Sequence, residues 1–356
     1  MSQKTRSGGY PPGFQMLTDF EEDMPRYWGR KWKANTTIGK LRMVMLHRPG
    51  NEFLSVGKPT PWYPNESSLK AWGMLEKPNL EEMVKDHENV VDAFKQEQIE
   101  VVIRKPVPDD QLHQVFSVDT DDSSYPAVYG RVILRMLSEA RRGEEVPVYR
   151  TLADIGCPVV GMITGKGMAE GGTIGWLDEK HMIIQIHGIY YNTHEPEVMR
   201  ANESGFNQLS NIVKMQDPEV DVRIAPGYGY RIGSSTLNIT YQMVDKHTSI
   251  CDPKWISPYL TNWMEAEMDW NFITPPDKAC RHYGVNTVGP ETGVVLGPGK
   301  IMVPSPPSST QKGIKWLESI GIDVLQVDCA SIVVPRRDGF FHCTVSSLIR
   351  DSEPKD

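Results

Sequence analysis

The feature that most constrains the fold is a pattern that recurs five times along the chain. Each occurrence has a pair of strand-forming runs, a helix of roughly three to five turns and then a short strand. One unit shows it well: the hairpin TIGWLDEKHMIIQIHG, with Asp178 and Glu179 in its turn, precedes the helical EVMRANESGFNQLSNIVKM and the strand VDVRIA. The amino acids differ between units, so the secondary-structure pattern repeats and the sequence does not. It predicts an α/β protein built from about five similar modules.

The expected domain boundaries follow from where this pattern begins and ends. Residues 1–38 are rich in Gly, Pro and mixed charge, which predicts an irregular N-terminal leader. Residues 39–352 form one expected domain, because no linker rich in Pro, Ser or Gly separates the modules. The aromatic and polar stretch at 10–33 could cover the surface of a neighbouring subunit, so we expect a homo-oligomer.

Composition excludes several classes of partner. The net charge of -8 comes with no long basic block, which argues against nucleic acid. No apolar run reaches the roughly 18 residues of a membrane span, and the N-terminus lacks the apolar core of a signal peptide. The five cysteines are widely spaced and contain no CxxC pair, so reduced thiols are expected. Together these features predict a cytoplasmic protein.

Metal and nucleotide sites have little support in the sequence. The spacing of His181, His187 and His194 fits neither strand alternation nor the close spacing of helical metal ligands. The glycine-rich stretches MITGKGMAEGG and GPGYGYRIG lack the GxxxxGK[ST] phosphate loop before a helix. We therefore expect no metal and no cofactor.

Cys343 stands near the end of the chain, in GFFHCTVSSLIRD. A cysteine in an apolar strand is often only a small buried side chain. The neighbouring His342 would face the opposite side of such a strand, because successive side chains alternate. On these grounds a catalytic Cys343 and a structural Cys343 both remain open.

Six blocks of sequence, in order, resemble those of the pentein superfamily, which includes arginine deiminases and amidinotransferases. They are VMLHRPGNEF, FSVDTDD, VILRMLSEARRGEE, AEGGT, LNITYQMVD and FFHCT, and the resemblance runs from about residue 40 to 351. It implies an α/β propeller of five ββαβ modules around a pseudo-fivefold axis, with a nucleophilic cysteine at the floor of the central channel. This agrees with the five modules found above.

The resemblance also assigns roles to individual residues. Cys343 would be the nucleophile that attacks a planar carbon flanked by nitrogens and forms a covalent S-linked intermediate. Asp119 in FSVD and Glu170 in AEGG would hold the N–H groups of the substrate, for which a carboxylate is well suited. The alternative is that both acids are ordinary turn residues.

Departures from the family pattern concern the remaining site positions. Thr236 and Asn238 stand where deiminases have a His-x-Asp pair, so the usual general acid and base is missing. Tyr190 and Tyr191 replace part of an Arg-Thr-Asn stretch whose arginine binds the substrate's carboxylate. Thr173 replaces an aspartate that often follows Glu-Gly-Gly. These five residues are expected to line the substrate site, and they favour a smaller, flatter and less charged substrate.

A reaction that tolerates the loss of the acid has a stable anion as its leaving group. Nitrite is one, so the chain most resembles a 2-nitroimidazole nitrohydrolase within the superfamily, and hydrolytic denitration of a nitroimidazole is the preferred hypothesis. One alternative is an amidine hydrolase or amidinotransferase that recruits another base, such as His187 or His282. Another is an inactive pentein that only binds a small, planar, nitrogen-rich ligand.

Overall fold

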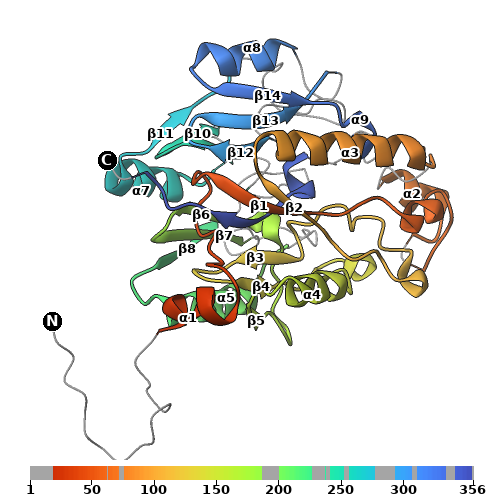
Figure 1. The fold of residues 1–356 in the computed structure, drawn as a ribbon, viewed down its shortest axis with the longest axis horizontal. Helices are drawn as coiled ribbons and strands as arrows, with labels where there is room; N and C mark the ends of the chain where they lie inside the picture. The colour runs from red at the N-terminus through yellow and green to blue at the C-terminus, as the bar shows by residue number, and fades with distance from the viewer. Residues whose placement is uncertain are drawn as a thin grey trace, which may run out of the picture.

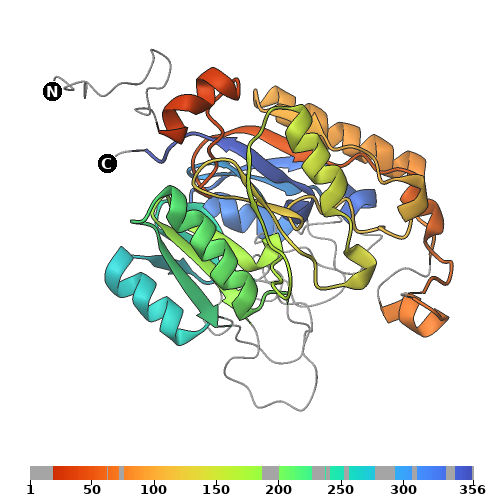
Figure 2. The ribbon, with the colours of Figure 1, turned by 90° about the horizontal axis from the view of Figure 1, so that it is seen from below.

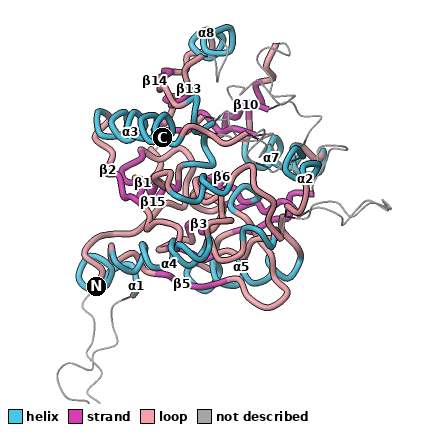
Figure 3. The backbone as a smooth tube through the Cα atoms, turned by 90° about the vertical axis from the view of Figure 1, so that its right-hand side faces the viewer, coloured by secondary structure: helices cyan, strands magenta, loops and turns pink. Residues whose placement is uncertain are grey.

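The computed structural model describes residues 19–61, 63–71, 76–186, 200–226, 237, 241–251, 256–276, 293–306, 311–333 and 341–354. Helices lie around the outside of the strands, as the three ribbon and tube views show (Figures 1, 2 and 3). The helices are α1 (Phe20–Tyr27), α2 (Glu66–Ala71), α3 (Leu80–Gln96), α4 (Glu145–Asp154), α5 (Glu203–Gln216), α7 (Pro258–Met268), α8 (Gln311–Ser319) and α9 (Ala330–Val333). None of these helices is long and apolar enough to cross a bilayer.

The strands form five separate three-stranded sheets. Four sheets contain consecutive strands: β3 (Ser124–Pro126), β4 (Arg131–Ile133), β5 (Val159–Met162); β6 (Ile174–Asp178), β7 (His181–Ile186), β8 (Asp221–Pro226); β9 (Tyr241–Asp245), β10 (Thr248–Cys251), β11 (Asn271–Ile273); and β12 (Val294–Gly297), β13 (Lys300–Pro304), β14 (Asp323–Val327). The fifth joins β1 (Leu41–Leu46) and β2 (Glu100–Ile103) to the C-terminal β15 (Ser346–Arg350).

All five sheets share one pattern of pairing. The middle strand pairs antiparallel with the strand that opens the module and parallel with the strand that follows the helix. A parallel pair needs a crossover, and α3, α4, α5, α7 and α8 supply it in turn. The five predicted α/β modules are confirmed. No sheet of the described strands closes into a ring, so the propeller arrangement stays a prediction.

The helices are held to the sheets by apolar stripes. In α3, Val90 and Phe94 face inward and pack with Leu46 of β1 and with Phe341. Burying a side chain of this size stabilises a fold by roughly 1.5–3 kcal/mol. Phe341 belongs to the short 3-10 helix η8 (Phe341–Thr344), so the core under the first sheet also fixes the segment that carries Cys343.

Part of the expected irregular leader has regular structure. α1 lies within it, and Met24 of this helix is buried together with Trp32. Residues 33–39 then run along the sheet edge, where Thr37 Oγ1 donates to the carbonyl of Trp176 (2.7 Å) and Asn35 Nδ2 donates to the carbonyl of Glu179 (3.1 Å). The expected irregular leader therefore contains a helix, which is held in place because apolar side chains gain free energy by burial. The boundary at residue 38 stays a prediction.

Candidate active site

Cys343 lies in the 3-10 helix η8, just before β15, and not within a strand. Its Sγ is 3.4 Å from Nε2 of His342. The prediction that His342 faces away from Cys343 is therefore wrong. Strand alternation does not apply in a turn of a 3-10 helix, where adjacent side chains can meet. A titratable ring stands beside the thiol.

The turn that carries Cys343 is fixed by hydrogen bonds to a neighbouring loop. Thr344 Oγ1 donates to the carbonyl of Phe341 at 2.7 Å. Thr120 Oγ1 donates to the carbonyl of Thr344 at 2.9 Å, and the backbone N–H of Asp121 donates to the carbonyl of Cys343 at 3.2 Å. These contacts bring the segment FSVDTDD against the cysteine.

The negative charges of three aspartates in this segment act on the Cys343 thiol. Burial raises the pKa of Cys343 well above its usual range, and Asp122, Asp119 and Asp121 raise it further, whereas Arg200 opposes them. Burial also raises the pKa of Asp121 to about 7. In this environment the thiol is therefore protonated near neutral pH. A ligand that offsets the three carboxylates would favour the thiolate.

Asp122 anchors a buried network of ion pairs. Its Oδ2 accepts from Arg141 at 2.8 Å, and Arg141 also donates to Glu144 at 2.9 Å. All three side chains are almost fully enclosed. Although burial opposes it, Arg141 and Arg200 hold the pKa of Asp122 below its usual range. Asp122 therefore acts as a fixed negative charge beside Cys343.

Glu170 precedes the 3-10 turn η4 (Gly171–Thr173) and is buried. Its Oε1 accepts from the backbone N–H of Leu137 at 2.9 Å, and its Oε2 accepts from Nη1 of Arg200 at 3.1 Å. The Glu-Gly-Gly turn also grips the acidic loop, because Gly172 N–H donates to Asp122 Oδ1 at 3.1 Å. Glu170 thus positions Arg200 close to the aspartates and Cys343.

The other predicted site residues divide into two groups. Thr173 is fully buried, and its Oγ1 donates to the carbonyl of Glu170 at 2.7 Å. The Thr173 hydroxyl thus donates its proton within the η4 turn. A contact between Thr173 and a substrate stays a prediction. Four predicted residues and both alternative bases lie outside the described residues: Tyr190, Tyr191, Thr236, Asn238, His187 and His282.

Sequence reasoning missed four residues of this arrangement, Asp121, Asp122, Arg141 and Arg200. The first three stand inside blocks that carry the family resemblance, FSVDTDD and VILRMLSEARRGEE. The clustering of charged residues in these two blocks is the signal that could have identified them as site residues. No pattern pointed to Arg200, which meets Glu170 only through the fold. Among the described residues, no group of His, Cys, Asp and Glu side chains is arranged to hold a metal ion.

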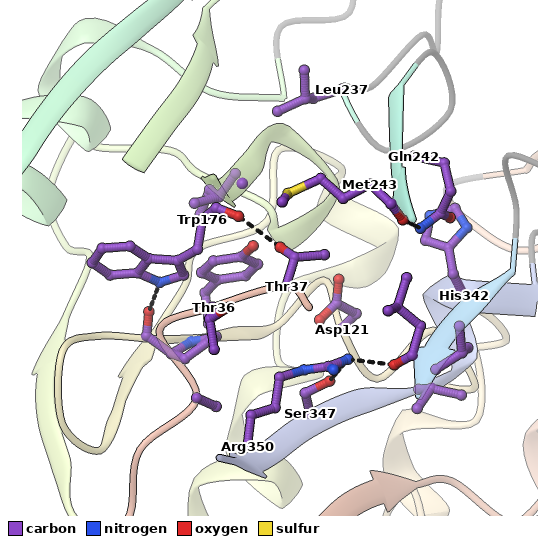
Figure 4. A pocket seen from close by; sticks show the side chains of 18 of the residues that line it. Thr36, Thr37, Asp121, Trp176, Leu237, Gln242, Met243, His342, Ser347 and Arg350 are labelled. Atoms are coloured by element: carbon purple, nitrogen blue, oxygen red, sulfur yellow. Dashed lines mark hydrogen bonds between the residues drawn. The ribbon is translucent and has the colours of Figure 1, made fainter. Parts of the chain in front are cut away.

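A cavity of about 130 Å³ lies behind the cysteine turn (Figure 4). Its wall includes residues from the first strand of every sheet, namely β3, β6, β9, β12 and β15. Ala34, Thr36 and Thr37 of the N-terminal segment also line it, as do His342 and Asp121. The cavity therefore adjoins the cysteine turn through His342 and the acidic loop through Asp121.

Comparisons by sequence gave no match: no family model and no curated protein matches the chain. Solved structures do match. Dimethylarginine dimethylaminohydrolase from Pseudomonas aeruginosa, complexed with citrulline, is 16% identical with a TM-score of 0.59 over 86% of this chain and 99% of that chain. An amidinotransferase of the saxitoxin pathway from Microseira wollei is 12% identical with a TM-score of 0.61 over 91% and 99%.

A further match is the N-terminal domain of ArgZ covalently bound to a reaction intermediate, which is 14% identical with a TM-score of 0.59. It covers 88% of this chain and 99% of that chain. At such identities the likeness concerns the fold alone. It agrees with the five modules of identical strand pairing. The chain has the fold of the pentein enzymes, the superfamily that its motifs resemble.

Proposed function

We propose that the protein is a cysteine-dependent hydrolase that attacks a planar N–C–N carbon. The observation that carries this proposal is the position of the Cys343 thiol among Asp119, Asp121 and Asp122, with its pKa raised by burial and by their charges. A planar group that presents N–H to these carboxylates is a good partner for them. Its binding offsets their negative field, so the thiolate forms when substrate is present.

The reaction then proceeds in two steps. The Cys343 thiolate adds to the carbon, the C–S bond forms, and the leaving group departs with the electron pair of its bond to carbon. Water then attacks the same carbon and loses a proton, and the C–S electron pair returns to sulfur. One substrate and one water give an oxo product and the leaving group. Asp119 and Glu170 are the proposed holders of the substrate's N–H groups.

The preferred substrate is a 2-nitroimidazole, with nitrite as the leaving group. Arg200 supports this choice, since its guanidinium is held by Glu170 and interacts with the charge on Cys343. A fixed cation beside the nucleophile stabilises the negative charge that a nitro group develops as it departs.

The second candidate is an amidine hydrolase or amidinotransferase with an amine leaving group. His342 supports it, because the ring 3.4 Å from Cys343 supplies the acid that the sequence lacks at Thr236. The structural likeness to a dimethylaminohydrolase and an amidinotransferase is a second argument for this class. The acidic surroundings of Cys343 would suit a cationic amidine.

The deciding experiment measures both classes of product with the same purified protein. Nitrite and imidazolone from 2-nitroimidazole would support denitration; ammonia, urea or ornithine from arginine or agmatine would support the amidine class. Cys343→Ala is the control, and it should abolish product and any covalent adduct seen by intact-protein mass. Ligand binding without turnover in either protein would contradict the hydrolase and support a binding protein.

The proposal also includes a propeller arrangement of the five sheets and an assembly of several subunits. A cavity lined by one strand from each of the five sheets supports a five-bladed propeller around the site. We also expect a cytoplasmic homo-oligomer that acts on a small molecule without a cofactor. Sedimentation equilibrium tests the assembly, and a monomer at all concentrations would contradict it.

A further inference from the structure

Ala34, Thr36 and Thr37 form one part of the wall of the cavity behind the cysteine turn. Thr37 is held to Trp176 of β6, and Arg350 of β15 donates to the carbonyl of Gly39 at 2.8 Å. A water molecule needs about 10–15 Å³ of such space, so a cavity of about 130 Å³ has room for several. The cavity, called the chamber below, therefore has room for water beside the cysteine turn.

Two residues with proton-transfer chemistry face this chamber and also contact the cysteine turn. His342 lines the chamber, and its Nε2 is 3.4 Å from Cys343 Sγ. Asp121 lines the chamber as well, and its N–H binds the Cys343 carbonyl. Figure 4 shows both side chains at the same cavity. The chamber thus connects with the thiol through two titratable groups.

The groups around Asp121 determine its charge. Arg131 of β4 and Arg350 of β15 favour the ionised form, whereas Asp119 and Asp122 of the same loop oppose it. Tyr125 of β3 also faces Asp121. Burial is the largest influence and raises the pKa of Asp121 to about 7. A carboxyl group with this pKa exchanges protons readily near neutral pH.

We propose that His342 and Asp121, with the water of the chamber, form the proton relay that serves Cys343. The relay replaces the His-x-Asp pair that the sequence lacks, so it rests on the proposed hydrolase function. His342 exchanges the proton with the thiol and with the attacking water. Asp121 exchanges protons between His342 and the chamber through water.

Nitrite release through this relay conserves both protons and electrons. The Cys343 proton passes to His342 as the C–S bond forms, and nitrite departs with the C–N electron pair. His342 passes this proton to Asp121 and the chamber. Water then attacks, its proton passes to the neutral ring, and the C–S pair returns to sulfur, which takes the proton from His342. One proton is released for each nitrite.

The sign of the pH dependence follows from this balance. Nitrite release needs an ionised Asp121 as acceptor, so the rate should rise as pH increases through about 7. An amine leaving group instead takes a proton from the relay, so its rate should fall over the same range. In either case the change of rate near pH 7 should disappear in Asp121→Asn, because asparagine has the shape of aspartate but does not titrate.

The experiment compares Asp121→Asn, His342→Gly and His342→Gln with Asp92→Asn, which changes an exposed aspartate of α3 that does not line the chamber. We expect the His342 variants to lose roughly 10²- to 10⁴-fold in turnover. Added imidazole should restore part of the turnover of His342→Gly and not that of His342→Gln. Asp92→Asn should keep the wild-type pH profile. Turnover of His342→Gly within twofold of wild type would overturn the relay.

A second measurement needs no substrate and separates the two proposals. The alkylation rate of Cys343 by iodoacetamide is followed against pH in each variant. Because the Asp121 charge raises the pKa of the thiol, Asp121→Asn should shift the profile to lower pH. If wild type turns over no candidate, the hydrolase proposal fails, and this profile alone still tests the coupling. Profiles identical to wild type in the Asp121 and His342 variants would overturn the relay.

Discussion

Gly171 shows at the scale of one residue how closely the site is assembled. A Cβ atom at this position would lie 2.0 Å from the carbonyl oxygen of Asp121, far inside van der Waals contact. Its N–H donates to the carbonyl of Asp122 at 3.1 Å. The first glycine of AEGGT is therefore required because two backbone segments meet there, and these segments carry Glu170 and the aspartates.

We predict that Gly171→Ala sharply reduces turnover, because the Cβ must push the aspartate loop away from Cys343. Displacements of about 1 Å at a catalytic group can reduce rates by about 10²-fold. Gly297→Ala is the matched control, since a Cβ there meets its nearest neighbour at 3.8 Å. Steady-state rates of both variants test this, and equal rates would contradict it.

Arg141 is the central charge of the buried network beside the site. We predict that Arg141→Met lowers the free energy of unfolding by about 3–5 kcal/mol, because it leaves Asp122 and Glu144 enclosed without their cation. Urea denaturation measures the loss. Arg42→Met, which breaks an exposed pair with Asp351, should cost less than about 1 kcal/mol. Similar midpoints for the two variants would contradict this account.

The site residues that the sequence could predict are those embedded in short motifs. Cys343, Asp119 and Glu170 were assigned in this way, and the structure places the first two near one another and Glu170 on the adjoining turn. His342 was misjudged because a strand was assumed where a 3-10 turn stands. Arg200 was missed because its pairing with Glu170 is tertiary and leaves no local pattern.

At the scale of elements, the N-terminus of α5 links the helix to the site. Asn202 caps α5 by accepting from Gly205 N–H at 2.9 Å, and the same oxygen accepts from Met168 N–H at 3.0 Å. Its Nδ2 donates to the carbonyl of Lys166 at 2.8 Å. One cap therefore holds the loop before Glu170 close to the residues that follow Arg200.

We predict that Asn202→Ala reduces both stability and turnover. The lost cap should cost about 1 kcal/mol, and the loosened loop should disturb the pairing of Glu170 with Arg200. Asn79→Ala is the matched control, because Asn79 caps α3 through the N–H groups of Glu81 and Glu82, which lie away from the site. It should cost similar stability and leave turnover unchanged. Equal turnover in the two variants would contradict the prediction.

The elements themselves were largely predictable from sequence. The hairpin with Asp178 and Glu179 at its turn appears as β6 and β7, because alternating apolar residues and a polar turn are local signals. α1 was not expected, since its eight residues carry mixed charge and bury chiefly Met24. Its place depends on tertiary contacts of Met24 and Trp32 within one core cluster, which no local pattern encodes.

At the scale of the whole molecule, the two ends of the described chain complete one module. β1 and β15 lie side by side, although about 300 residues separate them in sequence (Figure 1). β15 contributes more than main-chain pairing. Arg131 of the second sheet is buried and donates to Ser347 O at 2.5 Å and to Ser346 Oγ at 2.6 Å. β15 thus fastens the first sheet to the second and the cysteine turn to both.

We predict that a chain lacking residues 341–356 does not reach a cooperative folded state. Its first sheet lacks an edge strand, and the guanidinium of Arg131 loses two acceptors in a buried place, which costs several kcal/mol.

A chain lacking only residues 352–356 is the control. It keeps β15 and loses chiefly the bond of Thr36 to Glu353 and that of Lys33 to Ser352. Thermal unfolding followed by circular dichroism should show one sharp transition for the control and none for the longer deletion. A shared midpoint would show that the fold closes without β15, and the cysteine turn would then be an appendage of a module that is complete without it.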